Sequence, residues 1–95
     1  MTDNLQIERS NQFKRDYKKA KKQGKNLALL HQVIEDLCAQ KLLPGKFRDH
    51  GLSHNWNNYR ELHLSGDWLL IYRIVQRENL LQLARLGSHA ELFKM

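Results

Sequence analysis

The sequence predicts a single α+β domain in which two helices cover one face of an antiparallel sheet. Two observations predict it: apolar residues recur at helical spacing in the first half of the chain, and they alternate with polar ones in the second half. The 95 residues suffice for one core, because a second would need roughly 50 residues of its own. We therefore expect residues 1–95 to form one domain with the order β, α, α, β, β, β.

The first elements are a short strand and a basic helix. Leu5 and Ile7 alternate with polar neighbours, as in a strand. Ser10 is the expected N-cap of the helix, and Gly24 is its expected end. The apolar stripe of this helix comprises Phe13, Tyr17 and Ala20.

Asn26 is expected to cap a second helix that ends at Pro44–Gly45, so that the two helices form a hairpin. Its apolar stripe comprises Leu27, Leu30, Ile34, Leu37 and Cys38. Cys38 is the only cysteine, which excludes disulfide scaffolds and multi-cysteine zinc frameworks. Its place on the stripe indicates a small core residue.

The rest of the chain predicts a long loop followed by a meander of three strands. The segment Lys46–Asn58 has no sustained period and is rich in Gly, Ser, Asn and His, so we expect a surface loop. The expected strands are Tyr59–Leu64, Trp68–Val75 and Leu80–Gly87, joined by turns at Ser65–Gly66 and Gln76–Asn79.

The turn lengths predict the register and hence the two faces of the sheet. The expected pairs are Val75 with Leu80, Leu70 with Arg85, Trp68 with Gly87, His63 with Trp68, and Glu61 with Leu70. The face expected under the helices carries Leu62, Leu64, Leu69, Ile71, Val75, Leu80, Ala84 and Leu86, with Arg73 as a misfit near the edge. The open face is expected to carry Tyr59, Glu61, His63, Trp68, Leu70, Tyr72 and Arg85.

At one end of this open face the register brings together residues that are far apart in the sequence. His63 ends its strand, Asp67 begins the next, Arg85 lies near the end of the last, and His89 follows shortly after. Strand spacings of about 4.8 Å place these four within roughly 10 Å of one another. Imidazoles, a carboxylate and a guanidinium can supply the base, the acid and the cation for attack of a ribose 2′-hydroxyl on its neighbouring phosphodiester without metal.

Two other interpretations of these residues stay open. His50 and His54 have a spacing that binds zinc on a helix, but Gly51 and Ser53 intervene in an expected loop, and we predict no metal site. The same aromatic and basic face also suits a non-catalytic module that binds RNA or a protein partner.

The net charge of +6 is concentrated in one segment. Residues 9–25 hold eight basic residues against one aspartate, and the remaining chain is almost neutral. Such a local field attracts polyanions such as RNA or the ribosome surface, although it also suits a solvated helix face. The polar start of the chain and the lack of a long apolar run predict neither a signal peptide nor a membrane span, and we expect a cytoplasmic protein.

The motifs of the second half resemble those of a known family. The stretch KFRDHGLSHNWNNYRELHLSGDWLLIY (residues 46–72), followed by Arg85, Gly87, His89 and the closing AELF, resembles the YafQ branch of the RelE superfamily of bacterial type II toxins. The similarity spans nearly the whole chain, and the fold of that family is the one predicted above from the residues.

The resemblance implies a ribosome-dependent mRNA endonuclease that cuts translated messages in the A site and is neutralised by an antitoxin, which in such systems binds DNA and forms a hetero-oligomer with the toxin. It implies no cofactor. It implies catalytic roles for His50, His63, Asp67, Arg85 and His89, with Arg85 on the scissile phosphate. Substrate contacts are implied for Trp68, Phe93, Lys46 and Arg48. Contacts with ribosomal RNA are expected from Lys14, Arg15, Lys18, Lys19, Lys21 and Lys22. His31 and His54 match no motif and are expected to be surface residues.

Overall fold

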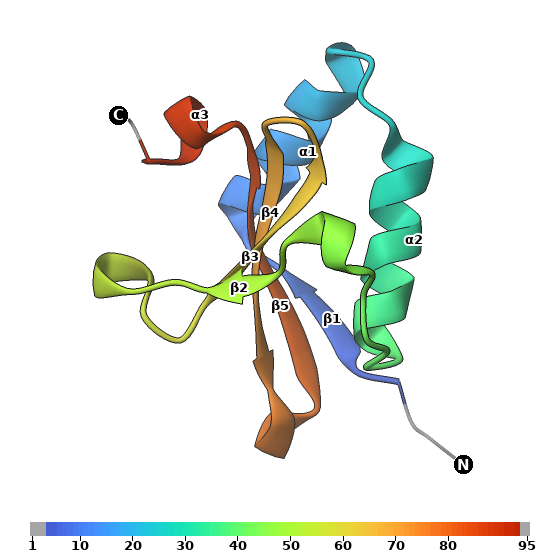
Figure 1. Ribbon diagram of the computed structural model, residues 1–95, viewed down its shortest axis with the longest axis vertical. Helices are drawn as coiled ribbons and strands as arrows, with labels where there is room; N and C mark the ends of the chain where they lie inside the picture. Colours follow the sequence, from blue (N-terminus) through green and yellow to red (C-terminus); the bar gives the residue numbers. More distant parts are fainter. Residues whose placement is uncertain (1–3, 94–95) are drawn as a thin grey trace.

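A five-stranded sheet organises residues 4–93, which are the residues that the structure, a computed structural model, describes (Figure 1). The strand order is β1-β5-β4-β3-β2, with β1 parallel to β5 and every other neighbouring pair antiparallel. The elements are β1 (Gln6–Arg9), α1 (Asn11–Lys22), α2 (Leu27–Cys38), β2 (His50–Gly51), β3 (Arg60–Ser65), β4 (Trp68–Val75), β5 (Leu80–Gly87) and α3 (His89–Phe93). The expected α+β class is confirmed. None of the helices within these residues is long and apolar enough to cross a membrane.

Both predicted helix caps are present. The Ser10 hydroxyl accepts a hydrogen bond from the backbone N–H of Phe13 at 2.9 Å, and the Asn26 side chain accepts one from Leu29 at 3.1 Å. Each cap satisfies a backbone donor that has no partner within its helix. The first helix therefore starts where the sequence predicts, directly after β1, and this fixes the basic surface relative to the sheet.

The second helix is shorter than predicted, because it ends at Cys38 and not at Pro44–Gly45. Gln40 adopts a left-handed backbone with φ 56°, and the N–H of Lys41 donates to the carbonyl of Asp36 at 2.9 Å. This pairing closes the helix in a Schellman motif, here with glutamine in the position that glycine usually occupies. The absence of a glycine at this point explains why the sequence did not reveal the end.

Two short elements lie where the sequence predicted none. Within the expected loop Lys46–Asn58, the strand β2 pairs with β3, and two turns of 3₁₀ helix flank it. After β5 the chain forms α3, which lies on the side of the sheet opposite α2 (Figure 1). Two strand residues and five helical residues are too few to show a period in the sequence.

The main core lies between the sheet and the two long helices. Phe13 and Ala20 of α1 and Leu30, Val33 and Leu37 of α2 are buried against the sheet. The sheet residues on this side are Leu62, Leu64, Trp68, Leu70, Tyr72, Leu81, Leu83 and Leu86, with Ile74 partly buried beside them. Cys38 is buried in the same core, in agreement with its position on the apolar stripe.

The faces of β4 and of much of β5 are reversed relative to the prediction. Leu69, Ile71 and Ala84 pack on the side away from α1 and α2, in a second apolar cluster with Leu52, Trp56, Tyr59, Leu92 and Phe93. Residues expected on the open face, Trp68, Leu70 and Tyr72, are instead buried under the helices, and Ile74 and Leu81 face the helices in place of Val75 and Leu80. The run from Trp68 to Tyr72 is apolar throughout because both faces of β4 are covered, so alternation cannot indicate its orientation.

Two register shifts and a displaced turn account for the pairs that differ from the prediction. The turn between β3 and β4 is Gly66–Asp67 and not Ser65–Gly66, because Ser65 still pairs with Trp68. Val75 pairs with Leu80 as expected, but the ladder passes from Tyr72–Leu83 to Ile71–Arg85 and leaves Ala84 unpaired. A second shift lies between His63 and Ser65. The predicted pairs beyond these points are therefore wrong; the observed ones are Leu70 with Leu86, Leu69 with Gly87, His63 with Leu69, Ser65 with Trp68, and Glu61 with Ile71. Bulges of this kind redirect side chains near functional sites.

Candidate active site

Three strand ends and the start of α3 bring a cluster of histidines to one rim of the sheet. His50 of β2 pairs with Glu61 of β3, and His63 lies two residues further along the same strand, on the same face. His89 is the first residue of α3, directly beyond the end of β5. The ring centroids of His50 and His63 are 6.3 Å apart, and those of His63 and His89 are 5.8 Å apart.

Glu61 lies at the centre of this cluster. Its Oε1 atom is 3.4 Å from Nε2 of His50, 3.5 Å from Nε2 of His63 and 3.7 Å from Nε2 of His89. Only 3% of the Glu61 side chain is exposed. A carboxylate held this far from water costs free energy unless donors face it, and three imidazoles surround it here. Strand alternation in the sequence predicts that Glu61 shares a face with His63, but it does not indicate a role for Glu61.

Asp67 holds His89 in its orientation. The Oδ1 atom of Asp67 lies 2.9 Å from Nδ1 of His89 and also accepts a hydrogen bond from the His89 backbone N–H at 3.3 Å. These two bonds, the side-chain one first, lower the pKa of the Asp67 carboxyl below its ordinary value. The carboxylate thus accepts the Nδ1 proton, and Nε2 of His89 faces Glu61.

The other two histidines have partners that define their tautomers. Nδ1 of His50 is 2.7 Å from the carbonyl oxygen of Arg48, and a carbonyl only accepts, so Nδ1 donates and Nε2 of the neutral ring can take up a proton. Nδ1 of His63 is 3.1 Å from Nη2 of Arg48, and a guanidinium only donates, so this nitrogen accepts and Nε2 carries the ring proton. His63 therefore points a proton at Glu61, whereas Nε2 of His50 carries no proton in the neutral ring.

Asp49 anchors the segment that carries Arg48 and His50. Its Oδ1 accepts from Nε of Arg60 at 3.0 Å, and its Oδ2 accepts a hydrogen bond from the hydroxyl of Tyr72. Tyr72 is buried, and burial together with the bond to Asp49 raises its pKa above the ordinary value of a tyrosine. The segment is thereby fixed to β3 and β4, although it contains only two strand residues.

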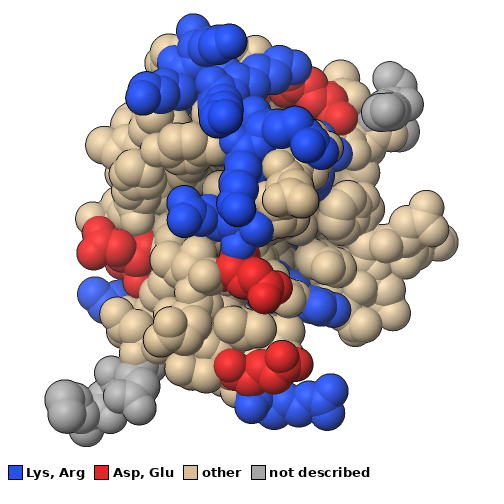
Figure 2. Space-filling view, turned by 180° about the vertical axis from the view of Figure 1, so that it is seen from behind, with Lys and Arg blue, Asp and Glu red and all other residues tan. Residues whose placement is uncertain are grey.

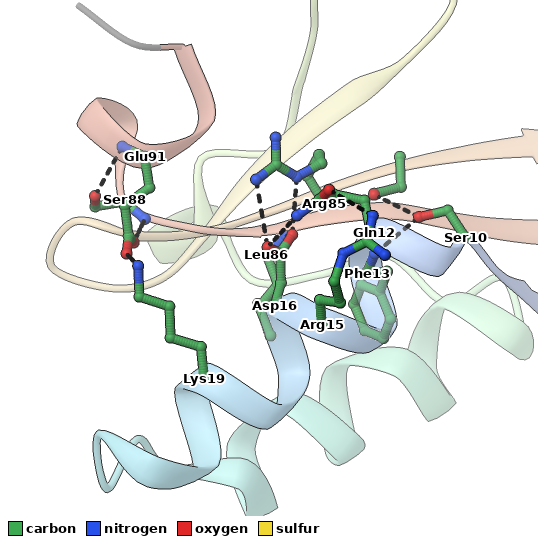
Figure 3. A network of polar contacts seen from close by, with 11 residues as sticks. Ser10, Gln12, Phe13, Arg15, Asp16, Lys19, Arg85, Leu86, Ser88 and Glu91 are labelled. Atoms are coloured by element: carbon green, nitrogen blue, oxygen red, sulfur yellow. Dashed lines mark hydrogen bonds and ion pairs between the residues drawn. The ribbon is translucent and has the colours of Figure 1, made fainter.

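Arg85 is engaged elsewhere in the structure. Its Nε and Nη2 donate to the carboxylate of Asp16 in α1 at 2.8 Å and 3.3 Å (Figure 3). Asp16 is itself buried and accepts the backbone N–H of Leu86 at 3.0 Å, at a point where β5 extends beyond β1. The predicted meeting of four residues thus includes His63, Asp67 and His89, while the guanidinium of Arg85 pairs with α1. No pattern in the sequence indicates that Asp16 caps this open edge.

The remaining candidate residues lie in different environments. Trp68 is only 3% exposed within the helix-covered core, so its ring is closed off from the open rim, and the substrate contact implied for it stays a prediction that this burial does not support. Phe93 packs against His89 with ring centroids 5.7 Å apart, at the edge of the site. Lys46 lies over the ring of Phe47, and exposed His54 lies in the turn after β2. Among residues 4–93 no set of three or more histidine, cysteine or acidic side chains is arranged to hold a metal ion.

The exposed side of α1 carries the basic residues predicted from the sequence. Seen from behind, Lys and Arg side chains gather in one band over this helix (Figure 2). Lys19 forms an ion pair with Glu91 of α3, and Ser88 and Glu91 cap one another's backbone N–H groups (Figure 3). His31 is exposed and bonds the hydroxyl of Tyr17 at 2.8 Å.

Comparison with known proteins identifies the family. Residues 5–94 match the family model described as the bacterial toxin of type II toxin–antitoxin system, YafQ. The chain belongs to the YafQ family. It is 40% identical to the mRNA interferase toxin YafQ of Escherichia coli strain B over 88 residues, which cover 92% of this chain and 94% of that protein.

Solved structures of YafQ-family and related toxins share the fold. A metal-bound toxin from Helicobacter pylori is 45% identical with a TM-score of 0.89, and the match covers 94% of this chain and 99% of that one. The E. coli DinJ–YafQ toxin–antitoxin complex contains a chain that is 36% identical with a TM-score of 0.84, covering 95% of this chain and 98% of that one. These matches agree with the resemblance seen in the sequence motifs.

Proposed function

We propose that this chain is the toxin of a type II pair and an endoribonuclease that cuts mRNA on the translating ribosome, in the cytoplasm. The observation that carries the proposal is the group of three imidazoles whose Nε2 atoms face one buried carboxylate at an open rim. The name of the E. coli relative, an mRNA interferase toxin, supports the same activity. Imidazoles are the side chains best suited to move protons at neutral pH.

The proposed reaction uses the nucleophile that RNA carries. The ribose 2′-oxygen forms a bond to the adjacent phosphorus while a base takes its proton, and the bond from phosphorus to the 5′-oxygen breaks. The departing 5′-oxygen keeps the electron pair and receives a proton from an acid. The products are a 2′,3′-cyclic phosphate and a 5′-hydroxyl, and the cluster needs to supply one base, one acid and one cation near the phosphorane.

We assign the base to His50 and the acid to His89. His50 gives its Nδ1 proton to a neutral carbonyl, which leaves Nε2 of the neutral ring ready to accept a proton. His89 lies between two carboxylates: its Nδ1 bonds Asp67 at 2.9 Å and its Nε2 lies 3.7 Å from Glu61, so Asp67 orients the ring and Nε2 is the atom placed to deliver a proton. Glu61 also stabilises the imidazolium that forms on His50 as the reaction proceeds.

We propose Arg48 as the main cation that binds the scissile phosphate. Arg48 already contacts His63 within the cluster, whereas Arg85 must leave Asp16 before it can reach a substrate there. His63 holds Arg48 and donates toward Glu61, and Arg85 then acts as a second cation that is released when substrate binds. Phe93 and Lys46 border this region and are proposed to contact the message, with Phe93 shaping the pocket next to His89.

A leaving-group experiment tests the assignment of acid and base. In an mRNA whose scissile 5′-oxygen is replaced by sulfur, the leaving thiolate needs no acid. On the normal message, His89→Gln and His50→Gln should each slow single-turnover cleavage by about 10²–10⁴-fold. The sulfur substrate should restore the rate of His89→Gln and leave His50→Gln slow; the opposite pattern would reverse the two roles.

Cleavage of translated messages also distinguishes the proposed enzyme from a metal-dependent nuclease and from a non-catalytic binding module. Cuts mapped at 5′ ends on translated messages should persist in a chelator; loss of the cuts on chelation would instead indicate a metal nuclease, a relevant control since a related Helicobacter toxin is metal-bound. Growth arrest with intact messages would indicate a non-catalytic binding module.

The basic side of α1 is proposed to bind ribosomal RNA. Lys14, Lys18 and Lys22 are exposed and lie four residues apart along one side of the helix. Replacing all three by Glu should weaken ribosome association and reduce its dependence on salt, because each lost phosphate contact removes released counterions. Arg15, Lys19 and Lys21 are proposed to act with them. An unchanged salt dependence would show that this side of the helix is only solvated.

We also propose a cognate antitoxin as partner. The DinJ–YafQ structure shows that a related toxin assembles with an antitoxin. The high positive charge of residues 9–25 suits an acidic segment on that partner, which in such pairs also carries a DNA-binding domain. Co-expression with the neighbouring reading frame should suppress toxicity and yield a hetero-oligomer; toxicity that persists beside a bound partner would contradict the neutralising role.

A further inference from the structure

The open face of the sheet continues from the histidine cluster toward the β4–β5 turn and carries a hollow that the cluster does not use. The hollow has a volume of about 360 Å³ and lies between the start of α1 and the β4–β5 ladder. Tyr59, Arg73 and Ala84 line it from the sheet, and Arg9 and Asn11 line it from the β1–α1 connection. Tyr59 and Ala84 also belong to the apolar cluster that includes Leu69 and Ile71, so the hollow and the histidines share one face.

Arg73 presents a fixed guanidinium in this hollow. Its Nε and Nη2 donate to Oε1 of Gln82 at 2.8 Å and 2.6 Å, and its guanidinium carbon lies 4.9 Å from the centre of the Tyr59 ring. Gln82 is held in turn by Glu8 at 2.6 Å. These contacts set the plane of the guanidinium in advance, so little side-chain entropy is lost when an anion binds.

The charge of Arg73 has no direct counterion within the described residues. The guanidinium groups of Arg60 and Arg85 each form an ion pair with an aspartate, whereas Arg73 bonds only a neutral amide among residues 4–93. Arg9 adds a second positive charge to the same hollow. One carboxylate, that of Glu8, also lines the hollow, but it is turned to Gln82, so the two guanidinium groups leave an excess of positive charge there. Such an excess forms a site for an anion, and a planar guanidinium suits a phosphate.

The distance between the hollow and the histidine cluster matches a few nucleotides of the RNA that the histidines are proposed to cut. Arg73 pairs with Gln82, and four residues away along β4, Leu69 pairs with His63 and with Gly87, two residues before His89. At about 3.3 Å per residue this separation is roughly 13 Å. A stacked single strand advances about 3.4 Å per nucleotide, so the distance corresponds to about four nucleotides, and to fewer if the strand is extended.

We propose that this hollow is a phosphate subsite for the message, in which Arg73 and Arg9 hold a backbone phosphate two to four nucleotides from the scissile bond. The inference rests on the proposed ribonuclease function and extends it from the reacting bond to the path of the strand. Tyr59 acts as a support beneath the guanidinium. The subsite joins the histidine cluster to the basic side of α1, because Arg9 ends β1 and only Ser10 separates it from that helix.

Binding of a non-cleavable oligonucleotide tests the subsite without requiring catalysis. The probe is a single-stranded 2′-deoxy oligonucleotide, and its affinity for the full-length protein is measured as a function of salt concentration. Arg73→Gln should reduce the slope of log K against log salt by about 0.7, the value of one phosphate contact on a single strand. Arg77→Gln is the matched control, because Arg77 is exposed on the β4–β5 turn outside the hollow, and it should leave the slope unchanged.

Neutral phosphates locate the contact. A methylphosphonate placed two to four nucleotides from the position that corresponds to the scissile bond should weaken binding to the wild type about 10-fold and should have no effect on Arg73→Gln. Tyr59→Leu should lower affinity as Arg73→Gln does, while Tyr59→Phe retains the ring and should bind normally. An equal response of Arg73→Gln and Arg77→Gln, a uniform effect of methylphosphonates, or no binding to the wild type at low salt would each overturn the proposal.

Two further measurements separate this inference from its premises. If the wild type cuts ribosome-bound mRNA, and Arg73→Gln neither raises KM nor changes the salt slope or the methylphosphonate effect, the subsite is wrong while the ribonuclease function stands. If the wild type cuts no message but shows the predicted salt slopes and methylphosphonate effects, the subsite stands while the ribonuclease function is wrong. Loss of affinity for the antitoxin without any loss of oligonucleotide binding in Arg73→Gln would assign the hollow to the protein partner and overturn the proposal.

Discussion

Replacing Tyr72 by Phe removes one oxygen atom and leaves the buried ring in place. The hydroxyl of Tyr72 donates to Asp49, which lies between Arg48 and His50 and accepts a second bond from Arg60 at 3.0 Å. The buried hydroxyl cannot touch the substrate. The substitution therefore tests whether this hydroxyl positions Arg48 and His50 through Asp49. Tyr72 is 1% exposed, so its side chain has no other route to the message.

The structure sets the size of the expected effect. A hydrogen bond to a charged group contributes about 1.5–3 kcal/mol. Asp49 keeps its bond to Arg60 and is 24% exposed, so water can replace part of the lost interaction, and the lower end of the range, about 1.5 kcal/mol, is expected. A domain with about 5–15 kcal/mol of stability remains folded after such a loss. Misplacement of Arg48 and His50 by about 1 Å should nevertheless slow cleavage by up to about 10²-fold.

Urea unfolding and single-turnover cleavage of ribosome-bound mRNA measure the two effects. Tyr17→Phe is the matched control, because it removes the same atom from a half-buried tyrosine whose hydroxyl bonds His31, outside the histidine cluster. The control should change neither the rate of cleavage nor, by more than about 0.5 kcal/mol, the stability. If Tyr72→Phe loses the expected stability but cleaves at the wild-type rate, Asp49 does not position the site and the reasoning fails.

Three further predictions concern α3 and its attachment. The bond with Lys19, followed by those with Ser88, lowers the pKa of Glu91 from 4.5 to about 2, so these contacts should contribute full stability above pH 4.5 and lose it as the pH falls toward 2. After allowance for solvent exposure, we expect a loss of about 1 kcal/mol between pH 6 and pH 3 by chemical denaturation, and a smaller loss in Lys19→Gln, which keeps the bonds with Ser88. Leu92→Ala should cost about 2–5 kcal/mol and slow cleavage by displacing α3, and equal thermal stability to the wild type would contradict this. Gly87→Ala places a Cβ about 3.2 Å from Leu92 and should slow cleavage more than Gly45→Ala, whose Cβ meets open space.

The parts of the fold that depend on local interactions could be predicted from the sequence. Ser10 and Asn26 act as caps because their side chains satisfy nearby backbone donors, and the hairpin turn pairs Val75 with Leu80 as its length requires. The orientation of β4 could not be predicted, because α3 and the segment before β3 cover the second face and make the strand apolar throughout. Ala84 is left unpaired by a register shift that turns length cannot show.

The candidate site was predictable to the extent that it follows from strand ends. His63, Asp67 and His89 meet because β3 and β5 end, and β4 begins, at one rim, and this required only the order of the strands. Glu61 becomes central only through burial, which no single position in the sequence reveals. Arg85 turned to α1 because Asp16 caps an edge that exists only once β1 stops short of the end of β5.

The central claim is that the message supplies its own nucleophile to the histidine cluster, and one substitution in the substrate tests it most directly. A ribosome is programmed with an mRNA in which the single ribose before the scissile bond is 2′-deoxy, and cleavage is followed at that bond. The proposed chemistry predicts that the bond stays intact while the all-ribose message is cut to a 2′,3′-cyclic phosphate. Cleavage of the deoxy message at the normal rate would contradict it.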